Sequence, residues 1–190
     1  LTKNFEKYKK KNKMERLKKL IIKINRGIGF EFVRYKPRTQ PLARRKKLLD
    51  IYKINLVLDV GANIGQYGKE LREIGYKGKI VSFEPLSLAY KELCEKSKKD
   101  DLWETHNFAL GDKNETEMIN IANNSFSSSL LDMLPSHQKA EPKSKYIGQE
   151  EIQIKTLDSI YSTLSSQTDS IYLKIDTQGF EENVLKCNEN

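Results

Sequence analysis

A short turn between two expected elements carries the residue types that could bind a small ligand. Asp59 lies near the end of the apolar run Leu56–Val60, and Gly61, Asn63 and Gly65 follow it. A strand, a glycine-rich turn and a helix place such a turn at the carboxyl edge of an open sheet, where ligands of these folds bind. Because glycine has no β-carbon, the backbone at Gly61 and Gly65 could approach a ligand closely.

The turn departs from two familiar nucleotide-binding turns. Asn63 stands where the fingerprint Gly-x-Gly-x-x-Gly has its second glycine, and Gln66 stands where it has its third. The Gly-Lys-Ser/Thr ending of a phosphate-binding loop is also absent. Asp59 would repel a pyrophosphate and attract a cation, directly or through water. The turn therefore favours a ligand with an ammonium group over a dinucleotide.

A second acid stands at the end of the next expected strand. Glu84 lies 25 residues after Asp59 and follows the run Lys79–Phe83. A carboxylate in that position can accept two hydrogen bonds from a ribose diol. Together the two acids fit a nucleoside that carries an amino-acid cation, and S-adenosylmethionine meets that description. Two plainer interpretations stay open: an ordinary strand-to-helix turn, and an acid at Glu84 that the dipole of the next helix favours.

The elements that must position these residues alternate between strands and helices. The expected strands are 56–60, 79–83, 103–110, 118–122, 151–155 and 170–175, and the expected helices are 42–52, 66–74, 157–161 and two that start at Pro85 and Gly179. This order predicts parallel βαβ units and a doubly wound α/β sheet of the Rossmann type, covered on both faces. The strands 118–122 and 151–155 pair either within this sheet or as a flap. The buried face of the helix after Pro85 is expected to contain Leu86, Leu88, Ala89, Leu93 and Cys94.

Charge divides the chain into two parts. The 190 residues include 34 basic and 26 acidic side chains, which gives a net charge of +8. Residues 1–55 hold 19 Lys and Arg against 4 acids, or +15, and this leaves −7 for residues 56–190. We therefore expect a basic N-terminal extension, 1–55, joined to an acidic α/β domain, 56–190.

The basic extension contains an amphipathic pattern. Apolar residues recur at steps of three and four between Met14 and Ile28, and lysines fill the other faces. Residues 10–28 could lie on an anionic membrane, where each basic residue contributes about 1 kcal/mol, or bind another polyanion. Alternatively, the apolar stripe packs on the domain and the lysines are solvated.

Several protein classes do not fit this sequence. No apolar run approaches the roughly 18 residues of a membrane-spanning helix, and the first residues lack the pattern of a secretory signal. Cys94 and Cys187 lie in segments expected to be helical, which argues against a disulfide framework or a zinc site. We expect a cytoplasmic protein, with the basic extension at the inner face of the membrane as a further expectation.

Five motifs, taken in order, resemble those of the FkbM-type S-adenosylmethionine-dependent methyltransferases. They are Val57–Gly65, Ser82–Pro85, Phe108–Asp112, Thr156–Asp158 and Leu173–Glu181, so the resemblance spans residues 56–186. It implies a class I methyltransferase fold and O-methylation of a sugar or secondary metabolite. By position, it implies that Asp59, Gly61, Asn63 and Gly65 line the methionine part of the cofactor, Glu84 the ribose, and Ala109 and Leu110 the adenine.

The same resemblance places Asp176 at the methyl group and the acceptor. Methyl transfer is an in-line displacement, so positioning supplies much of the rate. Because a sugar hydroxyl is a poor nucleophile, Asp176 is the leading candidate for the base that takes its proton. Alternatively, Asp176 caps the turn 177–179, and Glu181 is a weaker candidate base. Three further sites are more typical of structural or solvated positions: His106, His137 and residues 125–129. No cluster of residues has the spacing of a metal site.

One departure concerns the end of the sequence. A class I sheet has three further strands after the helix that starts near Gly179, but the sequence stops at Asn190. We therefore expect a sheet truncated after its fourth core strand, with 171–175 as an unpaired apolar edge. Two rival functions stay open. One is methylation of nucleic acid, against which the acidic domain argues, and the other is a non-catalytic module that binds a membrane or partner through its basic helix.

Overall fold

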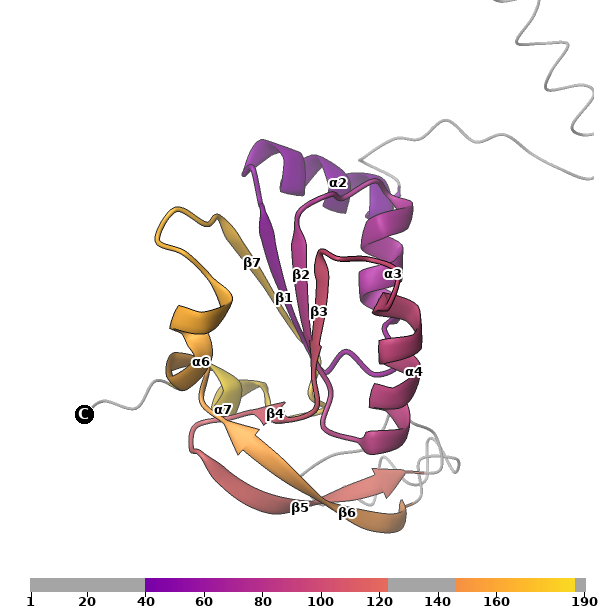
Figure 1. The fold of residues 1–190 in the computed structure, drawn as a ribbon, viewed down its shortest axis with the longest axis vertical. Coiled ribbons are helices and arrows are strands. Elements are labelled where there is room, and N and C mark those ends of the chain that lie inside the picture. The colour runs from indigo at the N-terminus through magenta and orange to yellow at the C-terminus, as the bar shows by residue number, and fades with distance from the viewer. Residues whose placement is uncertain (1–39, 123–145, 187–190) are drawn as a thin grey trace, which may run out of the picture.

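A computed structural model describes residues 40–122 and 146–186, and its centre is a four-stranded parallel sheet (Figure 1). The strand order is β3-β2-β1-β7. β1 spans Leu56–Val60, β2 Lys79–Phe83, β3 Trp103–His106 and β7 Ile171–Ile175. Every neighbouring pair is parallel. The carboxyl ends of the four strands therefore meet at one edge of the sheet.

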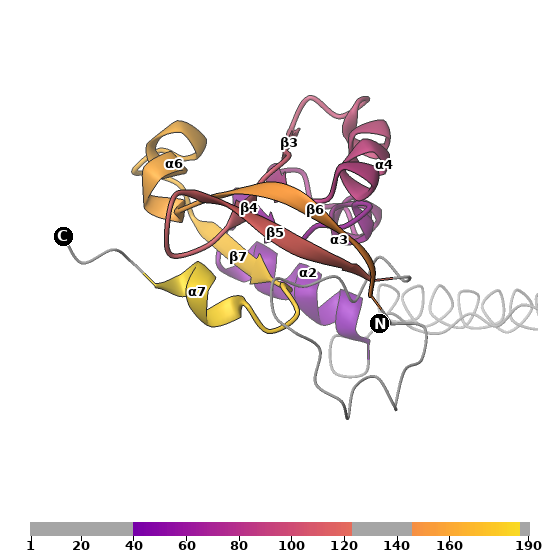
Figure 2. The same ribbon diagram turned by 90° about the horizontal axis from the view of Figure 1, so that it is seen from below.

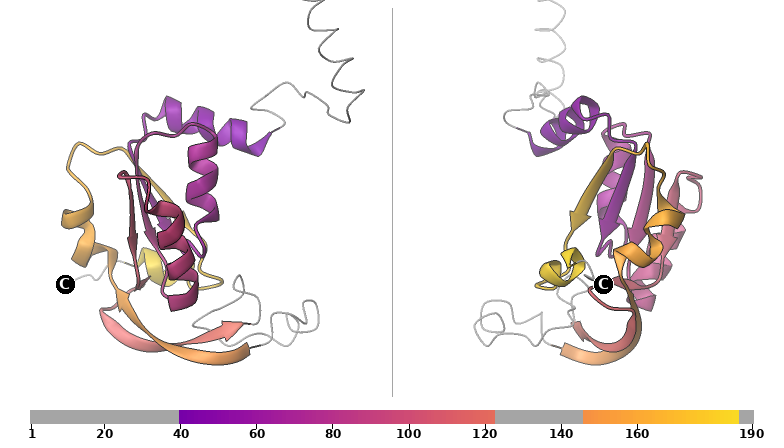
Figure 3. Two further views of the ribbon diagram at one scale, coloured as in Figure 1. Left: turned by 45° about the vertical axis from the view of Figure 1, so that its right-hand side comes forward. Right: turned by 90° about the vertical axis from the view of Figure 1, so that its left-hand side faces the viewer.

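Helices cover both faces of this sheet, as the alternating pattern predicted. α3 (Gln66–Glu73) and α4 (Ser87–Ser97) lie on one face, and α6 (Leu157–Leu164) and α7 (Glu181–Leu185) lie on the other (Figures 1 and 3). α2 (Pro41–Ile51) lies at the amino ends of the strands. The expected helix 42–52 and the doubly wound arrangement are confirmed.

Two apolar cores follow from the alternation of β1. Leu58 packs in the same core as Leu164 of α6, whereas Val57 packs in the opposite core with Leu93 of α4. Successive side chains of a strand point to opposite faces, and burying each such apolar side chain contributes about 1.5–3 kcal/mol. Asp59 follows Leu58, so the strand turns its carboxylate toward the side of α3 and α4.

A second, smaller sheet lies across the carboxyl ends of the main strands (Figures 1 and 2). It contains β4 (Ala109–Leu110), β5 (Glu115–Ala122) and β6 (Tyr146–Lys155) in the order β4-β6-β5. β4 is parallel to β6, and β5 is antiparallel to β6. The expected strands 118–122 and 151–155 are confirmed as a pair, and they lie outside the main sheet.

The run 103–110 is not a single strand, which corrects the prediction. Asn107 interrupts it, because its side-chain amide donates hydrogen bonds to the carbonyl oxygens of Glu84 and Pro85, each at 2.9 Å. β3 therefore stays in the main sheet and β4 joins the smaller one. This break brings the residues of β4 to the carboxyl edge of the main strands.

α4 starts two residues later than predicted. Leu86 has an extended backbone, and the N–H of Ser87 donates to a carboxylate oxygen of Glu150 in β6 at 3.0 Å. Leu88, expected on the buried face, is 80% exposed. Ala89 and Leu93 are buried as predicted, and Ser97 continues the same face, so that its residues are spaced four apart.

Some of the sequence predictions concern residues outside the ranges that the structure describes. They are the amphipathic helix within 10–28, the stretch 125–129, His137 and Cys187. Among the helices of residues 40–122 and 146–186, none is long and apolar enough to cross a membrane. In the same ranges, β1 is the only strand that pairs with β7. The division at residue 55 and the truncation of the sheet stay predictions.

Candidate functional site

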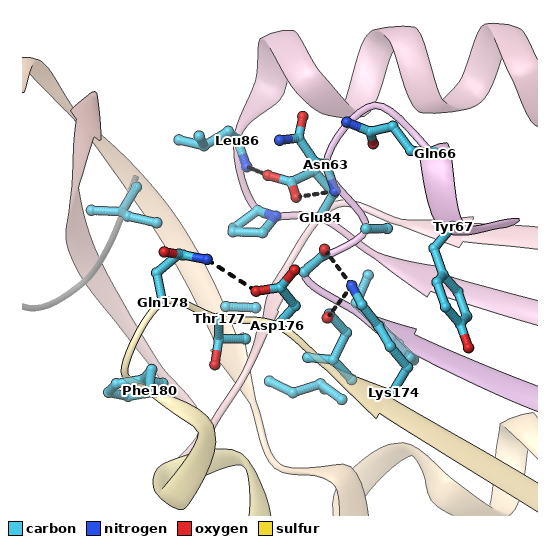
Figure 4. Close-up of a pocket in the computed structure, with 18 of the residues that line it drawn as sticks. Asn63, Gln66, Tyr67, Glu84, Leu86, Lys174, Asp176, Thr177, Gln178 and Phe180 are labelled. Carbon is cyan, nitrogen blue, oxygen red and sulfur yellow. Dashed lines mark hydrogen bonds between the residues drawn. The ribbon is translucent and has the colours of Figure 1, made fainter. Parts of the chain in front are cut away.

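A cavity of about 290 Å³ opens at the carboxyl ends of β1, β2 and β7, against the smaller sheet (Figure 4). Its polar wall comes from the turn after β1, the end of β2 and the loop after β7. Its apolar wall comes from β4 and β5. The walls include Gly61, Asn63, Glu84, Ala109, Leu110, Lys174, Asp176 and Gln178. Because ligands of open α/β folds bind at this edge, the cavity is the candidate binding site.

The turn after β1 is shaped by its contacts with β2 and β7. Gly61 has φ +70°, and a β-carbon there would lie 2.1 Å from the backbone oxygen of Asp176. The N–H groups of Gly61 and Ala62 donate to the carbonyl oxygen of Phe83 at 3.1 and 3.0 Å. Glycine at position 61 is therefore required by the close contact with the chain after β7. The prediction from the sequence was different: a close approach of the Gly61 backbone to a ligand.

Gly65 does not line the cavity. Its φ is +81°, and a β-carbon there would lie 2.8 Å from Cδ1 of Leu93 and 3.3 Å from the ring of Trp103. Trp103 is buried, and its indole N–H donates to Oγ of Ser82 at 3.0 Å. The structure gives Gly65 a packing role, since the missing side chain lets the start of α3 approach the core.

Glu84 lies at the end of β2, where two backbone groups hold its carboxylate. The N–H of Asn63 donates to Oε2 at 2.8 Å, and the N–H of Leu86 donates to Oε1 at 3.0 Å (Figure 4). The residue is 5% exposed. Burial raises the pKa of Glu84, and the two hydrogen bonds oppose that change. Each carboxylate oxygen can accept a further hydrogen bond from a ligand in the cavity.

Asp59 does not line the cavity with Glu84, which corrects the prediction that two acids hold one ligand. Asp59 is fully buried, and its Oδ1 lies 3.0 Å from Nζ of Lys174. Oγ of Ser82 donates to its Oδ2 at 3.3 Å. Burial raises the pKa of Asp59, and the Lys174 ammonium opposes that change. The alternation of β1 explains this placement, since it turns Asp59 beneath the turn.

Asp176 follows β7 and lines the cavity. Its Oδ1 accepts a hydrogen bond from Nε2 of Gln178 at 3.0 Å (Figure 4). Gln178 has φ +55° and lines the cavity as well. The carboxylate predicted to act as the base is thus held at the cavity wall by its own loop.

Glu181 caps the turn 177–179. The sequence had left this role open for Asp176. Its carboxylate accepts hydrogen bonds from the N–H groups of Gly179 and Thr177, each at 3.1 Å. These backbone hydrogen bonds lower the pKa of Glu181. Glu181 therefore holds the loop after β7 in shape, and its engaged oxygens argue against its role as a base.

The two residues predicted at the adenine, Ala109 and Leu110, lie on the apolar side of the cavity. His106 lies elsewhere: its ring stacks on that of Phe83 with 5.4 Å between centroids, and its Nε2 lies 2.8 Å from a carboxylate oxygen of Glu104. In the part of the chain that the structure describes, no group of three or more His, Cys, Asp or Glu could hold a metal ion.

Sequence reasoning missed several polar residues of the cavity, and two of them, Lys174 and Gln178, contact residues that it did predict. A lysine inside the apolar run 171–175 is itself a signal, because a charge in a buried strand needs an ionic partner. Its partner is Asp59, which stands opposite Lys174 in the pairing of β1 with β7. Gln178 carries no comparable signal, since its position depends on the conformation of the loop.

The layered α/β architecture, with its mostly parallel central sheet and its cavity at the carboxyl edge, is that of a methyltransferase-like protein. A family model described as the methyltransferase FkbM domain matches residues 59–190. The chain belongs to this family of methyltransferases, as its five motifs predicted. No curated protein and no solved structure matches it.

Proposed function

We propose that the cavity binds S-adenosylmethionine and that the protein methylates a hydroxyl group of a sugar or secondary metabolite. Glu84 carries this proposal. Its buried carboxylate faces the cavity, and a backbone N–H group holds each of its two oxygens. A fixed carboxylate at the end of the second strand suits the diol of a ribose.

The charges around the cavity favour a cationic ligand. Among the described residues, the charged ones in its walls are Glu70, Glu84, Lys174 and Asp176. Lys174 pairs with the buried Asp59 at 3.0 Å, and Glu70 pairs with Arg45 of α2 at 2.8 Å. Within residues 40–122 and 146–186, neither Glu84 nor Asp176 forms an ion pair. They attract a sulfonium or ammonium group and repel a phosphate, which supports S-adenosylmethionine over a nucleotide.

The residues present fit the parts of this cofactor. Glu84 would hold the ribose, Ala109 and Leu110 would contact the adenine, and the turn 61–63 would hold the amino-acid part. Asp59 would not contact the cofactor, since it pairs with Lys174, which donates to the carbonyl oxygen of Gly61 in that turn. When bound, S-adenosylmethionine supplies an electrophilic methyl group.

Asp176 would take the proton of the acceptor hydroxyl. Gln178 fixes one of its oxygens and leaves the carboxylate in the wall of the cavity. A base in this position makes the hydroxyl a better nucleophile as the new bond forms. Holding the acceptor in line with the methyl group is the other contribution that the cavity makes to the rate.

Calorimetry of the full chain with S-adenosylmethionine tests the cofactor. We expect saturable binding, and we expect none for ATP, whose phosphates face the same carboxylates. A folded protein that does not bind S-adenosylmethionine would overturn the proposal.

Mass spectrometry of glycans and hydroxylated metabolites, incubated with cofactor carrying a labelled methyl group, tests the acceptor. We expect Asp176→Asn to keep cofactor binding and to lower methyl transfer by about 10²–10⁴-fold, the usual contribution of a general base. RNA serves as a further acceptor in the same assay. Transfer to RNA instead of to a glycan would replace the proposed acceptor class.

A further inference from the structure

Lys174 of β7 reaches under the turn that follows β1. Its Nζ donates to the carbonyl oxygens of Gly61 at 2.9 Å and Val60 at 3.2 Å (Figure 4). The same Nζ lies 3.0 Å from Oδ1 of Asp59. An ammonium group has three N–H donors, and three oxygens surround this one. The side chain is 15% exposed. Two hydrogen bonds and the ion pair with Asp59 therefore engage the ammonium group, which leaves the lysine unsuited to act as a base.

The two carbonyl groups that contact Lys174 belong to the two peptide planes on either side of Gly61. The N–H groups of the same two planes, those of Gly61 and Ala62, both donate to the carbonyl oxygen of Phe83 in β2. Each plane is thus held at one end by β2 and at the other by β7. Glycine has more backbone freedom than any other residue, so both anchors are needed to fix a turn built around it.

Asp59 completes this arrangement. It is fully buried and stands opposite Lys174 in the strand register, so its carboxylate fixes the position of the ammonium group. Asn63 lies two residues after Gly61, and its N–H donates to Oε2 of Glu84 at 2.8 Å. The conformation of the turn therefore decides whether Asn63 reaches the carboxylate that faces the cavity.

We propose that Lys174 is a positioning residue, which with Asp59 locks the peptide planes around Gly61 and so holds the cofactor-binding turn in shape. The inference rests on the proposed function in naming S-adenosylmethionine as the ligand of that turn. It assigns Asp59 a role through Lys174 and not through contact with the ligand.

Two variants separate positioning from simple charge balance. Lys174→Met leaves Asp59 as an unpaired buried carboxylate, so its thermal unfolding midpoint is expected to fall. The double variant Asp59→Asn/Lys174→Met removes both charges and is expected to recover most of that loss. We expect the double variant to bind S-adenosylmethionine at least tenfold more weakly than the unchanged protein, because the carbonyl anchors are still missing.

Lys79→Met is the matched control. Lys79 also lies on a strand of the main sheet, pairs with a carboxylate, that of Glu104 at 2.8 Å, and donates to a carbonyl oxygen, that of Leu164 at 3.3 Å. It stands at the amino end of β2 and does not line the cavity. Its substitution is expected to leave cofactor affinity unchanged.

Amide hydrogen exchange supplies a readout that needs no ligand. In the double variant we expect the amides of Gly61, Ala62 and Asn63 to exchange at least tenfold faster, while those of Ile80 and Val81 in β2 keep their rates. A double variant with full cofactor affinity overturns the proposal, whatever its exchange rates. If the unchanged protein binds no S-adenosylmethionine, the proposed function fails. In that case the exchange rates alone test the positioning role of Lys174. Unchanged exchange rates at Gly61, Ala62 and Asn63 in the double variant would overturn it.

Discussion

The proposed function depends most on Glu84, and the contacts of this residue show how to test its role. In Glu84→Gln, an amide N–H group would face one of the two backbone N–H groups that now donate to the carboxylate. We expect affinity for S-adenosylmethionine to fall at least about tenfold, because a hydrogen bond to a charged group contributes about 1.5–3 kcal/mol. Calorimetry measures the loss.

Glu104→Gln is the control for this variant. Glu104 is a carboxylate of β3 that pairs with Lys79 and does not line the cavity, so its substitution should leave the affinity unchanged. Full affinity in Glu84→Gln would contradict the assignment of the ribose to this residue.

The pKa of Glu84 predicts how binding depends on pH. Burial is the largest influence and raises the pKa above 4.5. As the pH falls, Glu84 therefore takes up a proton at a higher pH than an exposed glutamate does, and the ionised acceptor that we propose for the ribose hydroxyls is lost. We expect affinity to be constant near neutrality and to weaken on acidification, beginning above pH 4.5, with no such change in Glu84→Gln. Calorimetry across this pH range measures the effect, and tighter binding on acidification would be the contrary result.

Single residues also show where the sequence was sufficient and where it was not. Glu84 was predictable because the end of a strand defines its place along the chain. The ion pair of Asp59 was not predictable, because its partner Lys174 lies 115 residues away and meets it only through the register of β1 and β7. The face of the sheet on which Asp59 lies was predictable, since the alternation along β1 places Asp59 on the same face as Val57.

At the scale of elements, the smaller sheet forms one wall of the cavity and depends on its buried isoleucines. Ile154 of β6 is 2% exposed and packs with Ile119 and Ile152. We expect Ile154→Ala to lower the free energy of unfolding by about 2–5 kcal/mol, the usual cost of removing a buried isoleucine side chain. Denaturation in guanidinium chloride measures the change.

Ile147→Ala on the same strand is the comparison. Ile147 is 65% exposed, so its loss should change the free energy of unfolding by no more than about 0.5 kcal/mol. Equal losses in the two variants would show that the inner face of this sheet does not pack as described.

The break between β3 and β4 marks the limit of prediction for elements. The run 103–110 reads as one continuous strand because nothing in its periodicity marks Asn107. The interruption depends on two carbonyl groups that follow β2, more than 20 residues earlier in the sequence. Local pattern therefore predicted the strands and not the sheets to which they belong.

At the scale of the whole molecule, the division of charge makes a prediction about membranes. Residues 1–55 carry +15 and the remainder −7, and the basic pattern of 10–28 lies outside the described residues. We expect the full chain to sediment with vesicles that contain phosphatidylserine and to be released as salt is raised, since a Debye length of about 8 Å at physiological ionic strength screens such contacts.

Vesicles of phosphatidylcholine alone are the control and should bind little of the protein. Replacing Lys18, Lys19 and Lys23 by glutamate should abolish sedimentation with the anionic vesicles. Equal binding to both kinds of vesicle would show that charge does not drive the contact.

Trp103 has one more consequence for the study of this molecule. It is the chain's single tryptophan, it is 7% exposed, and it packs against Gly65, which directly precedes α3. Its fluorescence therefore has one source, and the emission maximum reports how well that corner of the protein excludes water. A fluorimeter can thus follow the loosening or tightening of this region without any label attached to the chain.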